Sequence, residues 1–315
     1  MNNKYIIDLS NIVKNTTGAT KLSKLSESIV EPTQIIQDSI KRLAQVVNFN
    51  IDSDLFKSFK KIKKYLKRYG EIVDLFIDVM IEIDWPPPMD FVPQQMMKII
   101  EFYNKNGIQK TEEAVSNTLT EYYDSEKINK MLSSWIMKDW ILKRKPILQS
   151  IIKAHIQKSY WISIPAMLTQ IEGIIVDGYC HKGWLGQDKL IRYIKKLYDL
   201  NSRTYNIDRV VKEILLNNIL VNFIHGYRIN STLSRNAILH GADIEYGTAK
   251  NSLKTILLFN YLQRSFELLV IKDSKIYHKI GCYYLIRSDK EKKVYSSETQ
   301  AKDEGKRPCK ICNLK

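Results

Sequence analysis

The chain has 315 residues, enough for about two domains and a sizeable buried core. Hydrophobic residues make up 44% of it and charged residues 26%, which excludes a largely disordered or fibrous protein. Lys and Arg number 49 against 34 Asp and Glu, so the net charge is +15. This charge favours a polyanionic partner, nucleic acid first and an anionic membrane surface second. The alternative explanation is an AT-rich genome that places Lys wherever the surface tolerates it.

The sequence carries no recognisable signal for secretion or membrane insertion. The first residues, MNNKYIIDLSNIVKN, lack the apolar core of a signal peptide, and no window approaches about 18 apolar residues without a charge. Four cysteines in a chain of 315 residues do not make a disulfide framework. We therefore expect a cytoplasmic protein with no membrane span.

The N-terminal part begins with a polar arm and continues as helices. Residues 1–32 are rich in Ser and Thr, and apolar spacings of three and four predict a helix from Pro32 onward. A second helix is expected over residues 55–69. It carries the basic residues Lys57, Lys60, Lys61, Lys63, Lys64, Lys67 and Arg68. Such a face either binds phosphates or is simply solvated, and both interpretations stay open.

The next segments are also expected to be helical. Residues 71–84 are apolar with interspersed acids, and their helical neighbours favour a helix over a buried strand. The run Trp-Pro-Pro-Pro-Met at 85–89 breaks the chain, because consecutive prolines cannot continue a helix. Further helices are expected at 93–104 (ended by Asn106–Gly107), 111–123, 126–143 and 147–158.

An apolar helix with an internal carboxylate is predicted over residues 160–180. Its Glu172 either faces solvent or serves a purpose, because burying an unpaired carboxylate is costly. A Gly-rich loop at 181–187 follows. Later elements are helices at 187–200, 207–224 and 248–270, and then β-like runs in the tail (KIYH, CYYLI and KVYSS).

The segment SRNAILHG at 234–241 carries residue types suited to a phosphodiester. Asn236 and His240 are four residues apart and share one face of a helix. Arg235 and His240 lie about 140° apart on a regular helix, so they converge only if the motif starts at a helix N-terminus. His moves protons near neutral pH, and Arg stabilises charge that develops on phosphorus. For an isolated match, a surface Arg and a core His are the alternative.

The context of this motif resembles the HEPN superfamily of small helical ribonuclease domains. SIPAMLTQIEGII is followed by SRNAILHGADIEYGTAKNSLKTILLFNYL, so a Glu, an RN-x-x-x-HG motif and an apolar helix come in the family's order. The resemblance covers about residues 147–270. It implies Arg235 and His240 as the catalytic pair, Asn236 as the polar residue after the Arg, and Glu172 as a more weakly matched polar residue. It also implies a homodimer that cleaves RNA without metal, through attack by the ribose 2′-hydroxyl.

The remaining histidines and one cysteine have no convincing partner spacing. We expect His155, His181 and His225 to be surface histidines or histidines satisfied within the core. Cys180 is expected to be a small buried thiol, and a metal ligand beside His181 at a helix end is the alternative.

The tail carries two pairs of metal-ligand residues. His278-x3-Cys282 is followed by Cys309-x2-Cys312, a pattern that suits tetrahedral Zn²⁺. Four protein ligands close the site, so the zinc is expected to be structural. A redox C-x-x-C is the alternative, but no thioredoxin-like strand context is present.

The same tail resembles the zinc-binding domain of the Ada DNA-repair protein. The run YSSETQAKDEGKRPCKIC matches its order of strand, helix and R-P-C-x-x-C. His278 stands where that domain has the first of four cysteines, which argues against alkyl transfer. The resemblance leaves a basic zinc module that contacts nucleic acid through Lys306, Arg307 and Lys310.

These observations predict a mostly α protein in three parts. They are an N-terminal helical region (1–146), a helical-bundle HEPN-like ribonuclease domain (147–271) and a zinc-binding β/α module (272–315). The N-terminal region is expected to sense a trigger, bind RNA or hold the nuclease inactive. By analogy with the family, we expect a toxin or antiphage abortive-infection effector whose partners are RNA, a second copy, and an antitoxin or phage-derived trigger. The alternatives are a non-catalytic nucleic-acid-binding or regulatory protein that uses the domain to dimerise, and a structural dimer module that serves a partner enzyme.

Overall fold

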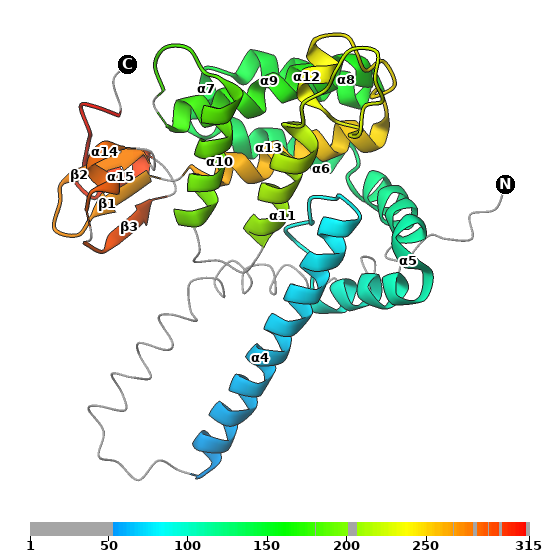
Figure 1. Ribbon diagram of the computed structural model, residues 1–315. Helices are drawn as coiled ribbons and strands as arrows, with labels where there is room; N and C mark the ends of the chain where they lie inside the picture. The colour runs from blue at the N-terminus through cyan, green and yellow to red at the C-terminus, as the bar shows by residue number, and fades with distance from the viewer. Residues whose placement is uncertain are drawn as a thin grey trace. The chain divides into compact units, whose positions relative to one another are not determined.

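The computed structural model describes residues 53–179, 181–200, 207–266, 268–279, 282–288, 290–295 and 298–312. These residues are mostly helical, with one small sheet near the C-terminus (Figure 1), which confirms the expected fold class at that level. The expected arm and the helix near Pro32 lie outside the described residues. The chain forms two compact units, and the division expected at residues 146 and 271 stays a prediction.

The first unit contains most of two long helices, α4 (Ser53–Glu82) and α5 (Pro93–Tyr122). Helix α4 runs without interruption through both segments expected at 55–69 and 71–84, which confirms the choice of helix for the second. The helix buries an apolar stripe at spacings of three and four: Val73, Phe76, Ile77 and Met80. Ile83, directly after the helix, is buried as well. Of its basic run, only Lys67 and Arg68 have described side chains, and Lys67 lies 3.9 Å from Glu71.

Helix α5 is kinked where the sequence predicted a helix end. Gly107 has φ 77° and ψ −179°, a conformation that breaks the helical backbone and is open to glycine. The amide of Asn106 donates to the carbonyl of Phe102 at 2.8 Å, and the hydroxyl of Thr111 donates to the carbonyl of Gly107 at 2.8 Å. Helical structure therefore resumes directly after the glycine.

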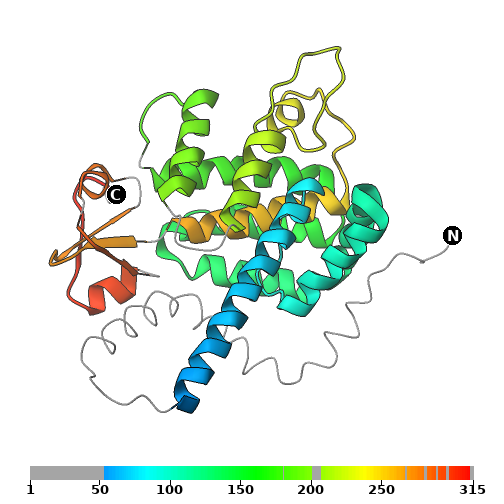
Figure 2. The same cartoon turned by 60° about the horizontal axis from the view of Figure 1, so that its bottom comes forward.

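The second unit is a helical bundle followed by the sheet. Its helices are α6 (Ser125–Ile136), α7 (Asp139–Leu142), α8 (Lys145–Ile156), α9 (Tyr160–Gly178), α10 (Gln187–Leu200), α11 (Ile207–Ile214) with a π-helical turn η1 (Leu215–Ile219), α12 (Arg235–Leu239) and α13 (Ala249–Ser265). Helices α9 and α13 lie side by side (Figures 1 and 2), and α8 packs against both. These three helices form the centre of the bundle.

Helix α13 is buried over its whole middle, residues 251–263, although several of its side chains are polar. The ammonium of Lys254 lies 3.0 Å from the carboxylate of Asp84 and 5.3 Å from the ring centroid of Trp85. The indole of Trp135 donates to the amide oxygen of Asn260 at 2.9 Å. Each of these buried polar groups thus has a partner, as burial requires.

The sheet has four short strands in the order β3-β1-β2-β4. They are β1 (Leu268–Ile271), β2 (Ile276–Lys279), β3 (Lys292–Tyr295) and β4 (Arg307–Pro308). Strand β1 is antiparallel to β2 and β3, and β2 is parallel to β4. Figure 2 shows these orange and red strands together with two short helices, α14 (Tyr283–Ile286) and α15 (Glu298–Asp303).

Two expectations for this region are wrong. The helix predicted to reach Val270 ends at Ser265, and residues 268–271 form β1 instead. The CYYLI run, expected to be β-like, contains the helix α14. In both places a short apolar run fits a buried strand and a buried helix equally well, so tertiary packing decides.

Candidate active site and metal centre

The Arg-Asn-x-x-x-His motif occupies a single short helix. Ser234 is the N-cap of α12: its hydroxyl accepts from the amide of Ala237 at 3.3 Å and donates to the carbonyl of Val221 at 2.9 Å. Serine is favoured at this position because its oxygen satisfies a free N–H group of the first turn. Arg235 is therefore the first residue of the helix, the arrangement that convergence of the motif requires.

Helix α9 brings Glu172 to this helix N-terminus. The guanidinium of Arg235 forms an ion pair with the carboxylate of Glu172, and the two side chains are 25% and 23% exposed. A second nitrogen of Arg235 donates to the amide oxygen of Asn236 at 3.0 Å. The structure thus joins three of the sequence-predicted residues, and Glu172 is paired rather than simply facing solvent.

A fourth residue, which sequence reasoning missed, completes the group. The amide of Asn236 donates to the side-chain oxygen of Gln187 at 2.7 Å, and the amide of Gln187 donates to the carbonyl of Leu220 at 2.6 Å. Gln187 is the first residue of α10. Its position at the end of the Gly-rich loop is the only signal in the sequence, and that signal does not identify a partner.

His240 lies at the other end of α12. It is the C-cap, and its backbone amide donates to the carbonyl of Asn236 at 3.0 Å. Its imidazole is exposed, with its ring centroid 6.1 Å from that of Phe223. No hydrogen bond joins this imidazole to Arg235, so among the described residues the motif has a partly buried guanidinium at one end and an exposed imidazole at the other.

The loop that carries α12 is held at both sides by the bundle. The amide nitrogen of Asn251, in the first turn of α13, donates to the carbonyl of Thr232 at 3.1 Å and to the carbonyl of Tyr246 at 3.0 Å. These two residues flank the motif. One buried side chain of α13 therefore positions the start and the end of the loop.

A very small cavity adjoins the ion pair. Its volume is about 10 Å³, and it is lined by apolar residues of α9, α10 and η1 together with Glu172 and Arg235. This volume suits about one water molecule and excludes a nucleobase. Any nucleotide at this site must therefore approach from the exposed side.

Two other histidines make local contacts, as expected. His155 has its Nδ1 2.8 Å from the hydroxyl of Ser252, and burial lowers the pKa of its imidazole to about 4. His181 has its Nδ1 3.1 Å from the hydroxyl of Tyr193. Cys180 lies outside the described residues.

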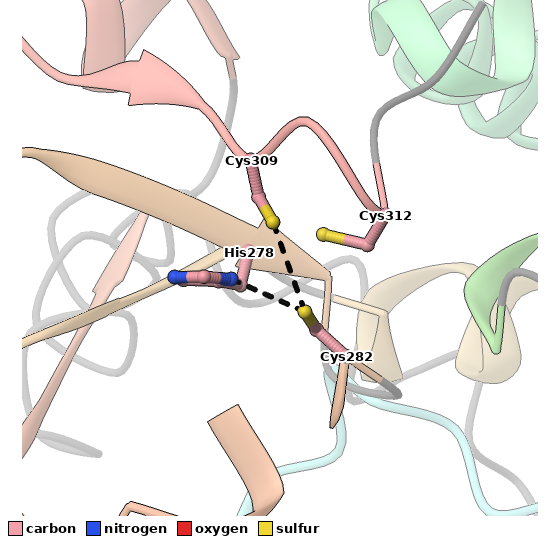
Figure 3. Close-up of side chains that lie close together, drawn as sticks. All are labelled: His278, Cys282, Cys309 and Cys312. Carbon is pink, nitrogen blue, oxygen red and sulfur yellow. Dashed lines mark hydrogen bonds between the residues drawn. The ribbon is translucent and has the colours of Figure 1, made fainter. Parts of the chain in front are cut away.

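The second site joins the four ligand-type residues of the tail. The ligand atoms of His278, Cys282, Cys309 and Cys312 all lie within 4.8 Å of one another, and all four residues are buried. Figure 3 shows the side chains pointing toward one another, His278 from β2 and the last two cysteines from the loop after β4. These residues are close enough to hold a metal ion, and three thiols with one imidazole are a donor set that suits Zn²⁺.

Backbone pairing explains how the two halves of this site meet. Strand β4 pairs in parallel with β2, with Pro308 opposite Tyr277, so His278 and Cys309 follow as neighbours. Backbone amides donate to two of the sulfurs, that of Lys279 to Cys312 at 3.3 Å and that of Ile311 to Cys309 at 3.4 Å. Such bonds stabilise thiolates, the form of cysteine that binds metal.

The protonation of Cys282 also fits a metal ligand. A hydrogen bond from the Cys312 thiol, followed by one from His278, lowers the pKa of Cys282 to about 4. The Nδ1 of His278 lies 3.2 Å from the sulfur of Cys282, which lies 3.9 Å from the sulfur of Cys309. Nδ1 is thus the imidazole nitrogen that faces the thiols.

No family model, curated protein or solved structure matches this chain. Among the described residues, no helix combines the length and the apolar character needed to cross a membrane.

Proposed function

We propose that this protein is a metal-independent endoribonuclease of the HEPN type. The observation that carries the proposal is the grouping of Glu172, Arg235 and Asn236 at the start of α12, with the exposed His240 at its end. The reaction is attack of a ribose 2′-hydroxyl on the adjacent phosphorus. Its products are a 2′,3′-cyclic phosphate and a 5′-hydroxyl.

The side chains have distinct roles in this reaction. Arg235 stabilises the charge that develops on the phosphoryl oxygens, and its ion pair with Glu172 and bond to Asn236 hold the guanidinium in one orientation. His240 is exposed and transfers a proton as a general acid or base. The cavity beside the pair is too small for a base, so the bases of a bound RNA would lie outside it.

Charge supports RNA as the polyanionic partner. The net charge of +15 favours association with a phosphate backbone in a sequence-independent way. A homodimer, as the family resemblance implies, places two motifs across a shared cleft.

The decisive experiment compares RNA cleavage by the wild-type protein with cleavage by Arg235→Ala and His240→Ala. Arg192→Ala, which removes an exposed charge from α10, is the matched control. We expect cleavage to fall about 100-fold or more in both motif variants. A positioned acid–base group such as His240 contributes about 10²-fold or more, and so does a group that stabilises developing charge, as proposed for Arg235. RNA binding and the circular dichroism spectrum are expected to persist. Equal cleavage by all four proteins would refute the proposal.

A chimeric substrate tests the chemistry separately. A DNA oligonucleotide with a single ribonucleotide is expected to be cut at that residue and to end in a 2′,3′-cyclic phosphate. The all-DNA control is expected to stay intact. The assay contains no added divalent ion, and it omits strong chelators because they would strip the tail site.

For the biological role, we propose a toxin or antiphage abortive-infection effector that acts in the cytoplasm and is controlled by an antitoxin or a phage-derived trigger. The test is growth of a host that expresses the wild-type protein or His240→Ala. Growth arrest by the wild type alone supports the role. Binding of RNA without cleavage or arrest would favour the alternative of a non-catalytic regulatory protein that dimerises.

For the tail, we propose a structural Zn²⁺ bound by His278, Cys282, Cys309 and Cys312. Four protein ligands leave no open position on the ion, so the metal stabilises the module and takes no part in RNA cleavage. Arg307 and Lys310 are exposed beside the ligands and provide contacts for nucleic acid, whereas Lys306 already donates to the carbonyl of Ser274 at 3.1 Å.

A further inference from the structure

A second histidine lies close to the candidate active site. The ring centroid of Phe223 is 4.8 Å from that of His225 and 6.1 Å from that of His240. Both distances fall in the range of packed aromatic pairs. Phe223 is half-buried, whereas both imidazoles are exposed. Two solvent-facing imidazoles therefore contact one phenyl ring beside the Arg235 helix.

A hydrogen-bonded turn holds His225 in place. The amide of Tyr227 donates to the carbonyl of Ile224 at 3.1 Å, so residues 224–227 form a β-turn with His225 in its second position. Gly226 follows with φ 81°, a left-handed conformation that favours glycine at the third position of a type II turn. The turn fixes the backbone that presents the imidazole.

The proposed reaction needs two proton transfers. The 2′-hydroxyl loses a proton as the bond from its oxygen to phosphorus forms. The 5′-oxygen gains a proton as its bond to phosphorus breaks. Entering and leaving oxygens lie on opposite sides of phosphorus in an in-line displacement, so one imidazole cannot serve both ends in a single step. Arg235 cannot serve as the acid or the base at neutral pH, because a guanidinium keeps its protons and its charge in proteins.

We infer that His225 is the second proton-transfer residue of this site, so that His225 and His240 of one chain share the roles of general acid and general base. The inference rests on the proposed ribonuclease function. One histidine accepts the proton of the 2′-hydroxyl, and the other, in its imidazolium form, donates a proton to the 5′-oxygen. The number of protons and electrons is conserved, and no metal or further reactant is needed. The substrate is an RNA strand whose backbone crosses the Phe223 ring between the two imidazoles.

The test measures single-turnover cleavage by the full-length protein on two substrates. Each is a DNA strand with one ribonucleotide, and in the second the 5′-bridging oxygen of the scissile phosphate is replaced by sulfur. A thiolate leaves without protonation, so this substrate bypasses the general acid. The variants are His225→Ala, His225→Phe and His240→Ala, with His181→Ala as the control. His225→Phe keeps an aromatic ring against Phe223 but cannot transfer a proton.

We expect both His225 variants to cleave the ordinary substrate about 100-fold more slowly than the wild type, with unchanged binding of an all-DNA strand. The sulfur substrate is expected to restore the rate for the variants of one histidine and not for those of the other, which identifies the acid. Restoration for neither histidine would overturn the shared roles.

Two outcomes separate this inference from the function on which it rests. Wild-type rates in both His225 variants, with a slow His240→Ala, would overturn the inference alone and would indicate that a second copy supplies the other group. Absence of cleavage by the wild-type protein on either substrate would overturn the proposed function as well.

Discussion

We expect His155 to make the stability of the folded protein sensitive to mild acid. The imidazole lies on α8, and its Nδ1 is 2.8 Å from the hydroxyl of Ser252, which is itself 2.7 Å from the hydroxyl of Ser163. Ser252 and Ser163 are buried between the three central helices. Burial lowers the pKa of His155 from 6.5 to about 4, so the folded protein keeps this imidazole neutral at pH 5 while the unfolded chain protonates it.

The sign and size of the effect follow from proton linkage. Between pH 6.5 and about 4 the unfolded state binds one more proton at His155 than the folded state does. The contribution of His155 to the free energy of unfolding is therefore fully present above pH 6.5 and is lost as the pH falls toward 4. The full difference corresponds to roughly 3 kcal/mol, of which about 2 kcal/mol is lost between pH 7 and pH 5.

Urea unfolding at pH 7 and pH 5 measures this loss. His155→Gln keeps a side chain that can hydrogen-bond Ser252 but does not titrate, so it is the matched variant. We expect the wild-type free energy of unfolding to fall by about 2 kcal/mol more than that of the variant, with similar m values. An equal fall in both proteins would refute the reasoning. If His155→Gln does not fold, an NMR titration of the wild-type imidazole that gives a midpoint near 6.5 would refute it equally.

Two further predictions concern packing and metal. Gly178→Ala is expected to lower the free energy of unfolding by about 1–3 kcal/mol, and with it the melting temperature. The reason is that the added β carbon would lie 2.1 Å from the ring of Phe266. The control is Gly70→Ala in α4, where an added β carbon meets nothing within 4 Å and is expected to stabilise the helix by up to about 1 kcal/mol. Melting temperatures that shift in the same direction for both variants would contradict the packing argument. Cys309→Ser is expected to lose the bound zinc that the wild type and Cys180→Ser retain at one ion per chain, as measured by elemental analysis; equal zinc in all three proteins would rule out the assigned ligands.

Sequence reasoning succeeded where spacing alone specifies geometry. Short gaps within His278-x3-Cys282 and Cys309-x2-Cys312 allow each pair to reach one point, and the structure places all four ligand atoms together. Periodicity likewise located α10 at residues 187–200, because its apolar and polar positions separate cleanly along a helix. Both inferences use local information.

Long-range contacts could not be predicted in this way. Gln187 contacts Asn236 across 49 positions, and Phe223 packs near His240 only after the chain has turned back. The end of α13 was also missed, because Phe266 settles against Gly178 of a distant helix and leaves the following apolar residues to form β1. Such outcomes depend on which surfaces meet, and a single sequence does not record that.

The two hydrogen bonds from Asn251 have an entropic consequence for the motif loop. A chain segment between fixed ends loses conformational freedom, and that cost must be met before its residues can act together. Here folding of the bundle already restricts the loop, because a buried amide of α13 hydrogen-bonds Thr232 and Tyr246 on either side of the motif. The backbone that carries Arg235 and His240 is thus held in place before any ligand arrives, so binding energy is not spent on assembling the loop.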